Sequence, residues 1–169
     1  YASGANTLAK LAKGSDDEVL TLASGVPSWA ASAGGGKIGQ VVQTVKTDTS
    51  TYGTAAWADI TGMAVTITPA ATDSKILVMS DASYSVTANY GAWIKVLRDT
   101  TDIYRGDAAS SRNQAAKGAI IYHSATSLSG SFMYLDSPAT TSATTYKLQW
   151  YPENTATIGI GRNISDTDA

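Results

Sequence analysis

The stretch KILVMSDASYSV, residues Lys75–Val86, has the clearest structural pattern in the chain. Apolar side chains recur at every second position, the period of a β-strand. One face carries Ile76, Val78, Ala82, Tyr84 and Val86. The other face carries Leu77 and Met79 near the start of the stretch. Because both faces are apolar there, we expect this strand to lie between two packed layers.

Similar short segments recur along the chain after residue 36 and are rich in Thr, Val, Ile, Tyr and Trp. The expected strands cover residues 37–46, 57–63, 65–67, 75–86, 91–98, 119–123, 128–135, 146–151 and 157–164. Polar turn residues separate them, and Pro69 ends one strand because it has no N–H for a ladder. No helix is expected in this region. The pattern predicts an all-β sandwich or jelly roll.

Residues 1–33 have a different pattern. Leu8 and Leu11 permit a short helical turn, and Val19–Leu22 form one short strand closed by a turn at Gly25–Pro27. These few apolar side chains cannot form an independent core. We therefore expect this segment to pack against the main domain or against copies of itself. We therefore predict an N-terminal segment 1–33, a glycine linker 34–36 and a β-sandwich domain 37–169.

Composition restricts the possible functions. Of the 169 residues, 43% are hydrophobic, but much of this is Ala, and there is one Phe. A thin core of this kind is commonly completed by oligomerisation. The net charge of −2, with scattered Lys and Arg, argues against a nucleic-acid partner. Cys is absent, and no apolar run approaches the ~20 residues of a membrane span, so membrane insertion is not expected.

Four segments carry a family resemblance. They are EVLTLASGVPSWA (Glu18–Ala30), GKIGQVVQTVKTDT (Gly36–Thr49), AVTITPAATDSKILVM (Ala64–Met79) and LDSPATTSATTYKLQW (Leu135–Trp150). With these segments the chain resembles bacteriophage fibre proteins with trimeric C-terminal knobs, particularly those of marine and cyanobacterial phages. The resemblance implies a parallel homotrimer with a slender fibre segment at residues 1–33. It also implies a jelly-roll-like antiparallel β-sandwich head of the TNF-like or C1q-like kind.

The same resemblance implies a noncatalytic structural role in the virion, most often attachment to a glycan or protein of the host surface. Other virion proteins would then bind on the N-terminal side. Family knobs usually continue past a stretch like Ser165–Asp168 into a final apolar strand, whereas this sequence stops at Ala169. It also opens at Tyr1 without Met. We therefore expect the sequence to be a piece of a longer chain.

No residue pattern points to catalysis, a metal or a cofactor. His123 is the single His and has no Cys, His or paired acids nearby, which is typical of a structural or surface histidine. Asp16–Glu18 is acidic but lacks the alternating oxygens and the glycine of a calcium loop. Arg105–Asp107 spells the integrin tripeptide, but a three-residue match is common by chance and fits an exposed turn.

Receptor binding is the function for which candidate residues exist. Arg105–Gly118 is a long polar loop, of the kind in which a rigid sandwich presents binding side chains, although an ordinary surface loop would look the same. Tyr90 is an aromatic residue at a turn, whereas Trp93 fits the core or a subunit contact, and Trp57, Trp150 and Tyr146 fit packing positions. The candidate receptor-binding residues are Tyr90, Arg105, Asp107, Arg112, Asn113 and Gln114.

Ser137–Thr145 carries no charge, and we expect it to pack near a neighbouring protomer, where a charge would be costly. Three functions remain open. The first is a tail-fibre knob for host attachment, and the second is a capsid fibre or decoration protein of the same fold. The third is a glycan depolymerase, which needs two carboxylates across a cleft. Asp102 and Asp107 are close in sequence, but nothing in the pattern indicates that they are buried together.

Overall fold

The computed structural model describes residues 2–4, 7–8, 10–32, 38–122 and 126–164, with the side chains of 2–8, 119 and 121 left out. The chain divides into two compact units, Tyr1–Val41 and Val42–Ala169. Every regular element among the described residues is a β-strand. The predicted glycine linker 34–36 lies outside the described residues.

The first unit consists of two antiparallel strand pairs. Strand β1 (Ala2–Gly4) pairs with β2 (Thr7–Leu8), and β3 (Glu18–Ala23) pairs with β4 (Val26–Ala31). The helical turn expected near Leu8 is therefore wrong. Strand β4 was missed, because Pro27 was read as a turn residue. Pro27 is tolerated since both strands of a hairpin are edge strands, and the turn is made by Ser24 and Gly25, which both have positive φ angles.

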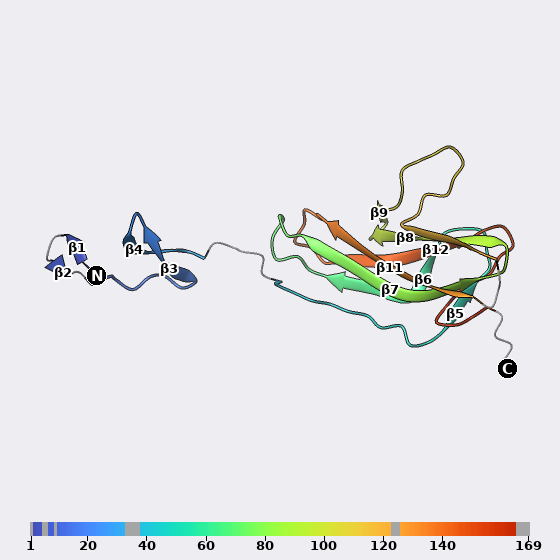
Figure 1. The fold of residues 1–169 in the computed structure, drawn as a ribbon, viewed down its shortest axis with the longest axis horizontal. Coiled ribbons are helices and arrows are strands. Elements are labelled where there is room, and N and C mark those ends of the chain that lie inside the picture. Colours follow the sequence, from blue (N-terminus) through green and yellow to red (C-terminus); the bar gives the residue numbers. More distant parts are fainter. Residues whose placement is uncertain (1, 5–6, 9, 33–37, 123–125, 165–169) are drawn as a thin grey trace. The chain divides into compact units, whose positions relative to one another are not determined.

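The second unit is a sandwich of two antiparallel sheets, which confirms the predicted fold class (Figure 1). The five-stranded sheet has the order β10-β8-β12-β6, with β9 also paired to β8. Its strands are β6 (Ala58–Ile67), β8 (Tyr90–Arg98), β9 (Thr101–Tyr104), β10 (Lys117–Ile121) and β12 (Thr144–Pro152). The four-stranded sheet has the order β11-β7-β13-β5. Its strands are β5 (Ser50–Tyr52), β7 (Ile76–Val86), β11 (Ser127–Asp136) and β13 (Ile158–Ile160).

The core lies between the two sheets. It contains Ile60, Tyr84, Ile94, Val96, Leu148, Trp150, Ile158 and Ile160, which come from both sheets. Strand β12 shows the alternation most clearly, because every second side chain from Thr144 to Pro152 is buried and those between them are half-buried. This is the pattern of a strand with one face toward a core.

Several predicted strands differ from those observed. The strand predicted at 157–164 is limited to Ile158–Ile160, and β5 and β9 were not predicted. Residues 38–46 form no strand, so the strand predicted at 37–46 is wrong over its described part. Thr44 instead donates a side-chain hydrogen bond to the Gly62 carbonyl at 3.2 Å. The two strands predicted at 57–63 and 65–67 are one strand, β6, whose register against β12 shifts between Lys147 and Gln149. Gly62 has a φ angle of +83°, which suits this irregularity.

Strand β7 is confirmed, but its second face is not covered by another layer. Leu77 and Met79 are 56% and 65% exposed. Their cross-strand partners on β11, Leu135 and Met133, are 60% and 66% exposed. We call these four side chains the apolar outer face. The expectation of two packed layers is wrong for the single chain, because apolar alternation does not show which face meets the core.

A buried polar cluster joins the two sheets. Asp136, at the end of β11, accepts hydrogen bonds from Arg98 of β8 at 2.8 Å and from the Tyr146 hydroxyl of β12 at 2.7 Å. Asp136 and Tyr146 are both buried. Burial raises the pKa of Tyr146, and the hydrogen bond to the Asp136 carboxylate raises it further. The cluster therefore holds a charge pair and a neutral tyrosine between the sheets.

The uncharged loop Ser137–Thr145 makes local hydrogen bonds through its hydroxyl groups. The Ser142 N–H donates to Thr140 Oγ1 at 3.0 Å, and Thr144 Oγ1 donates to the Ser142 carbonyl at 3.0 Å. Thr141 is exposed at the tip. Its contact with a neighbouring protomer stays a prediction.

Candidate functional site

Trp93 forms a flat aromatic surface on the outer side of the five-stranded sheet. A Cβ atom added at Gly118, its cross-strand partner, would lie 2.6 Å from Trp93 Cδ1. A Cβ atom at Gly91 would lie 2.6 Å from Trp93 Cη2. The indole therefore lies directly over the backbone of two glycines. A larger residue in place of either glycine would occupy the space of the ring. Trp93 is half-buried, so part of its ring remains accessible.

Two more aromatic side chains continue this surface. The ring of Tyr151 lies 5.8 Å from that of Trp93 and 5.5 Å from that of Trp57, centroid to centroid. The Lys95 ammonium lies 4.6 Å from the centre of the Trp57 ring, a cation–π contact. Trp57 was expected to be a packing residue, and it packs against Tyr151 and Lys95 in this outer row.

A groove of about 420 Å³ lies beside Trp93. Its remaining lining residues are Gly106, Asp107, Asn113, Gln114, Ala115, Gly118 and Ile120. Loop 105–116 thus forms one wall, and β10 contributes Gly118 and Ile120. The loop projects from the sandwich beyond β9 (yellow in Figure 1).

Hydrogen bonds join the two ends of the loop to each other and join the loop to β8. The Gly106 N–H donates to the Ala115 carbonyl at 2.9 Å, and Gln114 Nε2 donates to the Gly106 carbonyl at 3.0 Å. The Ala116 N–H donates to the Ile94 carbonyl of β8 at 2.8 Å. These contacts fix the position of the groove wall relative to the sheet.

Three of the six predicted receptor-binding residues meet in this groove: Asp107, Asn113 and Gln114. Among the described residues, the side chains of Asp107 and Asn113 make no polar contact, so their oxygen and nitrogen atoms are available to a ligand. The Gln114 amide oxygen is also available, because only its nitrogen is used.

The other three predicted residues lie outside the groove lining. Arg105 pairs with Asp102 at 2.8 Å, and Asp102 also pairs with Lys95 at 2.8 Å. Arg112 is exposed on the loop. Tyr90 is half-buried, because it packs against Val86 and Ala156. His123 lies outside the described residues.

Sequence reasoning missed Trp93 as a site residue because its place in an apolar strand favoured the core. The sequence did contain one indication of this role, because Gly91 lies two residues before Trp93 on the same face of the strand. A glycine there leaves room for a large ring to lie flat. The cross-strand Gly118 could not be paired with Trp93 before the register was known.

The groove combines one aromatic surface, one carboxylate and two amides. This set suits a polar, uncharged ligand with an apolar face. No group of three or more metal-ligating side chains occurs among the residues that the structure describes. Within the same residues, no helix is long and apolar enough to cross a membrane.

Comparison with models of known protein families found no match, and comparison with curated proteins found none either.

Proposed function

We propose that this protein is a noncatalytic attachment protein of a virion, the head of a homotrimeric tail fibre that binds a glycan on the host surface. The observation that carries the glycan-binding part is the Trp93 ring, laid flat over two glycines beside the polar groove. The virion role comes from the resemblance to phage fibre proteins. In this proposal the N-terminal unit connects the head to other virion proteins.

The groove fits a sugar for a chemical reason. A pyranose ring has an apolar face of C–H groups that packs on an aromatic ring, and hydroxyl groups at its edge that need polar partners. Trp93 supplies the aromatic surface, while Asp107 and Asn113 supply a carboxylate and an amide without other partners among the described residues. The ring and the polar groups line the same groove, so one ligand would contact both.

A glycan array with the recombinant protein, followed by calorimetry on the best glycan, tests this function. We expect Trp93→Ala to weaken binding at least tenfold, because the stacking surface is lost. Trp29→Ala, a matched change in the first unit, should leave the affinity unchanged. An array without binding, or equal affinity of wild type and Trp93→Ala, would overturn glycan recognition at this groove.

The homotrimer is supported by apolar side chains that a single chain leaves in water. The apolar outer face presents four large apolar side chains in two cross-strand pairs. In the first unit, Leu20 and Leu22 of β3 are also exposed. Patches of this kind mark interaction surfaces in soluble proteins. We therefore assign the apolar outer face to contact between protomers.

Sedimentation at physiological concentration measures the oligomeric state. We expect a trimer for the wild type and a shift toward monomer for Met79→Glu, since the new carboxylate would be buried without a partner. Ala70→Glu adds the same charge at an exposed turn and should remain trimeric. A monomeric wild type would remove the fibre proposal.

The two alternatives have separate tests. A capsid fibre would use the same head at another anchor, and the location of its density on the virion distinguishes it from a tail fibre. A glycan depolymerase needs a second carboxyl group with a raised pKa facing the first. Asp102 is held by Lys95 and Arg105, and Asp107 is exposed, so no observation favours this reaction. Release of reducing ends from host capsule or lipopolysaccharide would establish it.

A further inference from the structure

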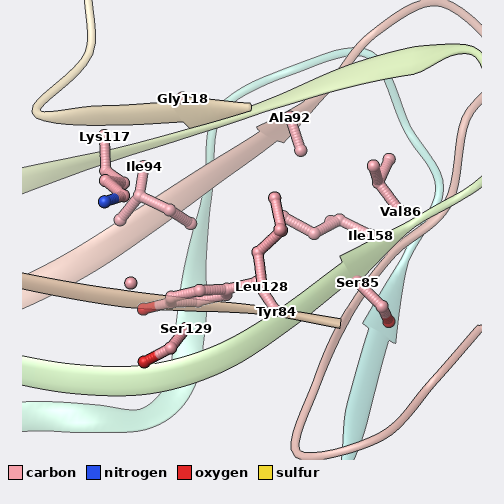
Figure 2. Close-up of a pocket in the computed structure, with 11 residues that line it drawn as sticks. Tyr84, Ser85, Val86, Ala92, Ile94, Lys117, Gly118, Leu128, Ser129 and Ile158 are labelled. Carbon is pink, nitrogen blue, oxygen red and sulfur yellow. The ribbon is translucent and has the colours of Figure 1, made fainter. Parts of the chain in front are cut away.

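A separate cavity of about 270 Å³ lies between the two sheets (Figure 2). Strands β10 and β11, which flank it, are the edge strands of the five-stranded and four-stranded sheets. Much of its wall is apolar, formed by Val86, Ile94, Leu128 and Ile158. Among the described residues, it shares only Gly118 with the groove beside Trp93.

Two polar groups of the cavity are available to a ligand in the described part of the chain. The hydroxyl of Tyr84 is buried, in a residue that is 9% exposed, and the Ser80 hydroxyl beside it acts as a donor, so no described acceptor takes the Tyr84 proton. Burial raises the pKa of Tyr84 to about 12, so this hydroxyl keeps its proton and remains a donor at neutral pH. Lys117, on β10, is exposed and forms no ion pair among the described residues.

In Figure 2 the Lys117 amine and the hydroxyls of Tyr84 and Ser129 lie on one side of the view, whereas Val86, Ala92 and the Ser85 hydroxyl lie on the other. The Ser85 hydroxyl is already used, because it donates to the Arg162 carbonyl at 2.7 Å. A buried hydroxyl proton without an acceptor is unfavourable, and a ligand acceptor would satisfy it. Water satisfies such a group poorly where the rest of the wall is apolar.

We propose that this cavity binds a medium-length alkyl carboxylate, with the alkyl chain between the sheets and the carboxylate at Lys117 and the Tyr84 hydroxyl. The size agrees with this class of ligand. At about 30 Å³ for each water-sized group, the volume holds roughly nine such groups. The ammonium of Lys117 would form an ion pair with the ligand carboxylate, whereas an uncharged amphiphile would form none. Of the described residues, the cavity shares only Gly118 with the glycan groove, so ligand binding here does not require a glycan in that groove.

Calorimetry of the full chain with octanoate, and with octan-1-ol as the uncharged match, tests the proposal. We expect octanoate to bind more tightly than octan-1-ol. Lys117→Met should weaken octanoate at least tenfold and change octan-1-ol less than twofold, because the variant removes the charge but keeps the apolar stem. Lys75→Met, a matched change outside the cavity lining, should change neither.

Filling the cavity gives a second test. Ala92→Leu and Leu128→Trp each add volume inside the cavity, and a folded variant of either kind should lose octanoate binding. Tyr84→Phe removes only the hydroxyl and should weaken octanoate more than octan-1-ol. Absence of octanoate binding to the wild type would overturn the proposal. So would binding that Lys117→Met and both filling variants leave unchanged.

Discussion

Asp136 links the two sheets through its buried carboxylate. Its carboxylate is buried at the end of β11 and bonded to Arg98 and Tyr146, both from the opposite sheet. A buried charge is tolerated only when it is paired and hydrogen-bonded. The cluster therefore ties β11 to β8 and β12 at one position, where a neutral residue would leave Arg98 without its counter-ion.

Asp136→Ala is expected to lower the free energy of unfolding by about 3–5 kcal/mol, the range for breaking a buried ion pair from one side. Urea titration followed by circular dichroism measures this change. Asp59→Ala is the comparison, because Asp59 pairs with Lys147 at 2.7 Å on the exposed side of the sheet and should cost less than about 1 kcal/mol. Equal losses in the two variants would contradict the role of burial.

The buried tyrosines predict a loss of stability at high pH. Burial raises the pKa of Tyr84 to about 12, whereas the ordinary value is 10.0. Between these values the unfolded chain gives up the proton and the folded chain retains it, so rising pH favours unfolding. Stability should be fully present below about pH 10 and then fall by at most about 1.4 kcal/mol per pH unit. Burial of Tyr146 acts in the same direction.

Urea midpoints at pH 8, 10, 11 and 12 measure this dependence. Tyr84→Phe should flatten the decline between pH 10 and 12, since the titrating hydroxyl is gone. A Tyr84→Phe curve parallel to that of the wild type would assign the decline to other groups.

Among the elements, the pairing of β8 with β10 creates the platform of the candidate site. The register places Gly118 opposite Trp93, and Gly91 lies two residues before it on the same face. Both glycines are needed for the ring to lie against the sheet. The flat aromatic surface is thus a property of two paired strands and not of Trp93 alone.

Gly118→Val is expected to displace the indole, because even a Cβ atom would lie 2.6 Å from Trp93 Cδ1. Glycan affinity should fall at least fivefold, while the far-ultraviolet circular dichroism stays that of the wild type. Gly39→Val is the control, since nothing lies within 4 Å of a Cβ atom at that position. Unchanged glycan affinity in Gly118→Val would show that the flat ring is not required.

At the scale of the whole molecule, the proposed homotrimer would bring three copies of the β-sandwich together. A trimer would present three glycan grooves from one fibre, so weak single contacts would add up to firm attachment through a high effective concentration. The uncharged loop Ser137–Thr145 is expected to lie near a neighbouring protomer in this trimer.

Thr141→Arg should lower the melting temperature of the trimer by several degrees, because a guanidinium would be placed against a neighbour without a partner. Thermal unfolding at two protein concentrations measures this. Thr54→Arg, at another exposed loop position, is the matched control. Equal melting curves for Thr141→Arg and the wild type would place the loop away from the interface.

The β-sandwich was predictable because alternation of apolar side chains is a local property. Strands β7, β8, β11 and β12 were all located from their period of two residues, and Pro69 marked the end of β6 two residues after Ile67. Prediction was poor where local signals were ambiguous. Pro27 resembled a turn residue, and the apolar residues of 38–46 resembled a strand although no neighbouring strand pairs with them.

Some residues of the candidate site could likewise be predicted from the sequence, and others could not. Its loop residues Asp107, Asn113 and Gln114 were predicted, because a long polar stretch between strands is visible in the residues themselves. Trp93, Gly118 and the cavity between the sheets required the fold, since each depends on residues that are far apart in the chain. Periodicity shows that a side chain points to one face of its strand, but burial depends on what packs against that face. The exposure of Leu77 and Met79 was therefore a result of sheet packing, a contact between distant segments that no local pattern contains.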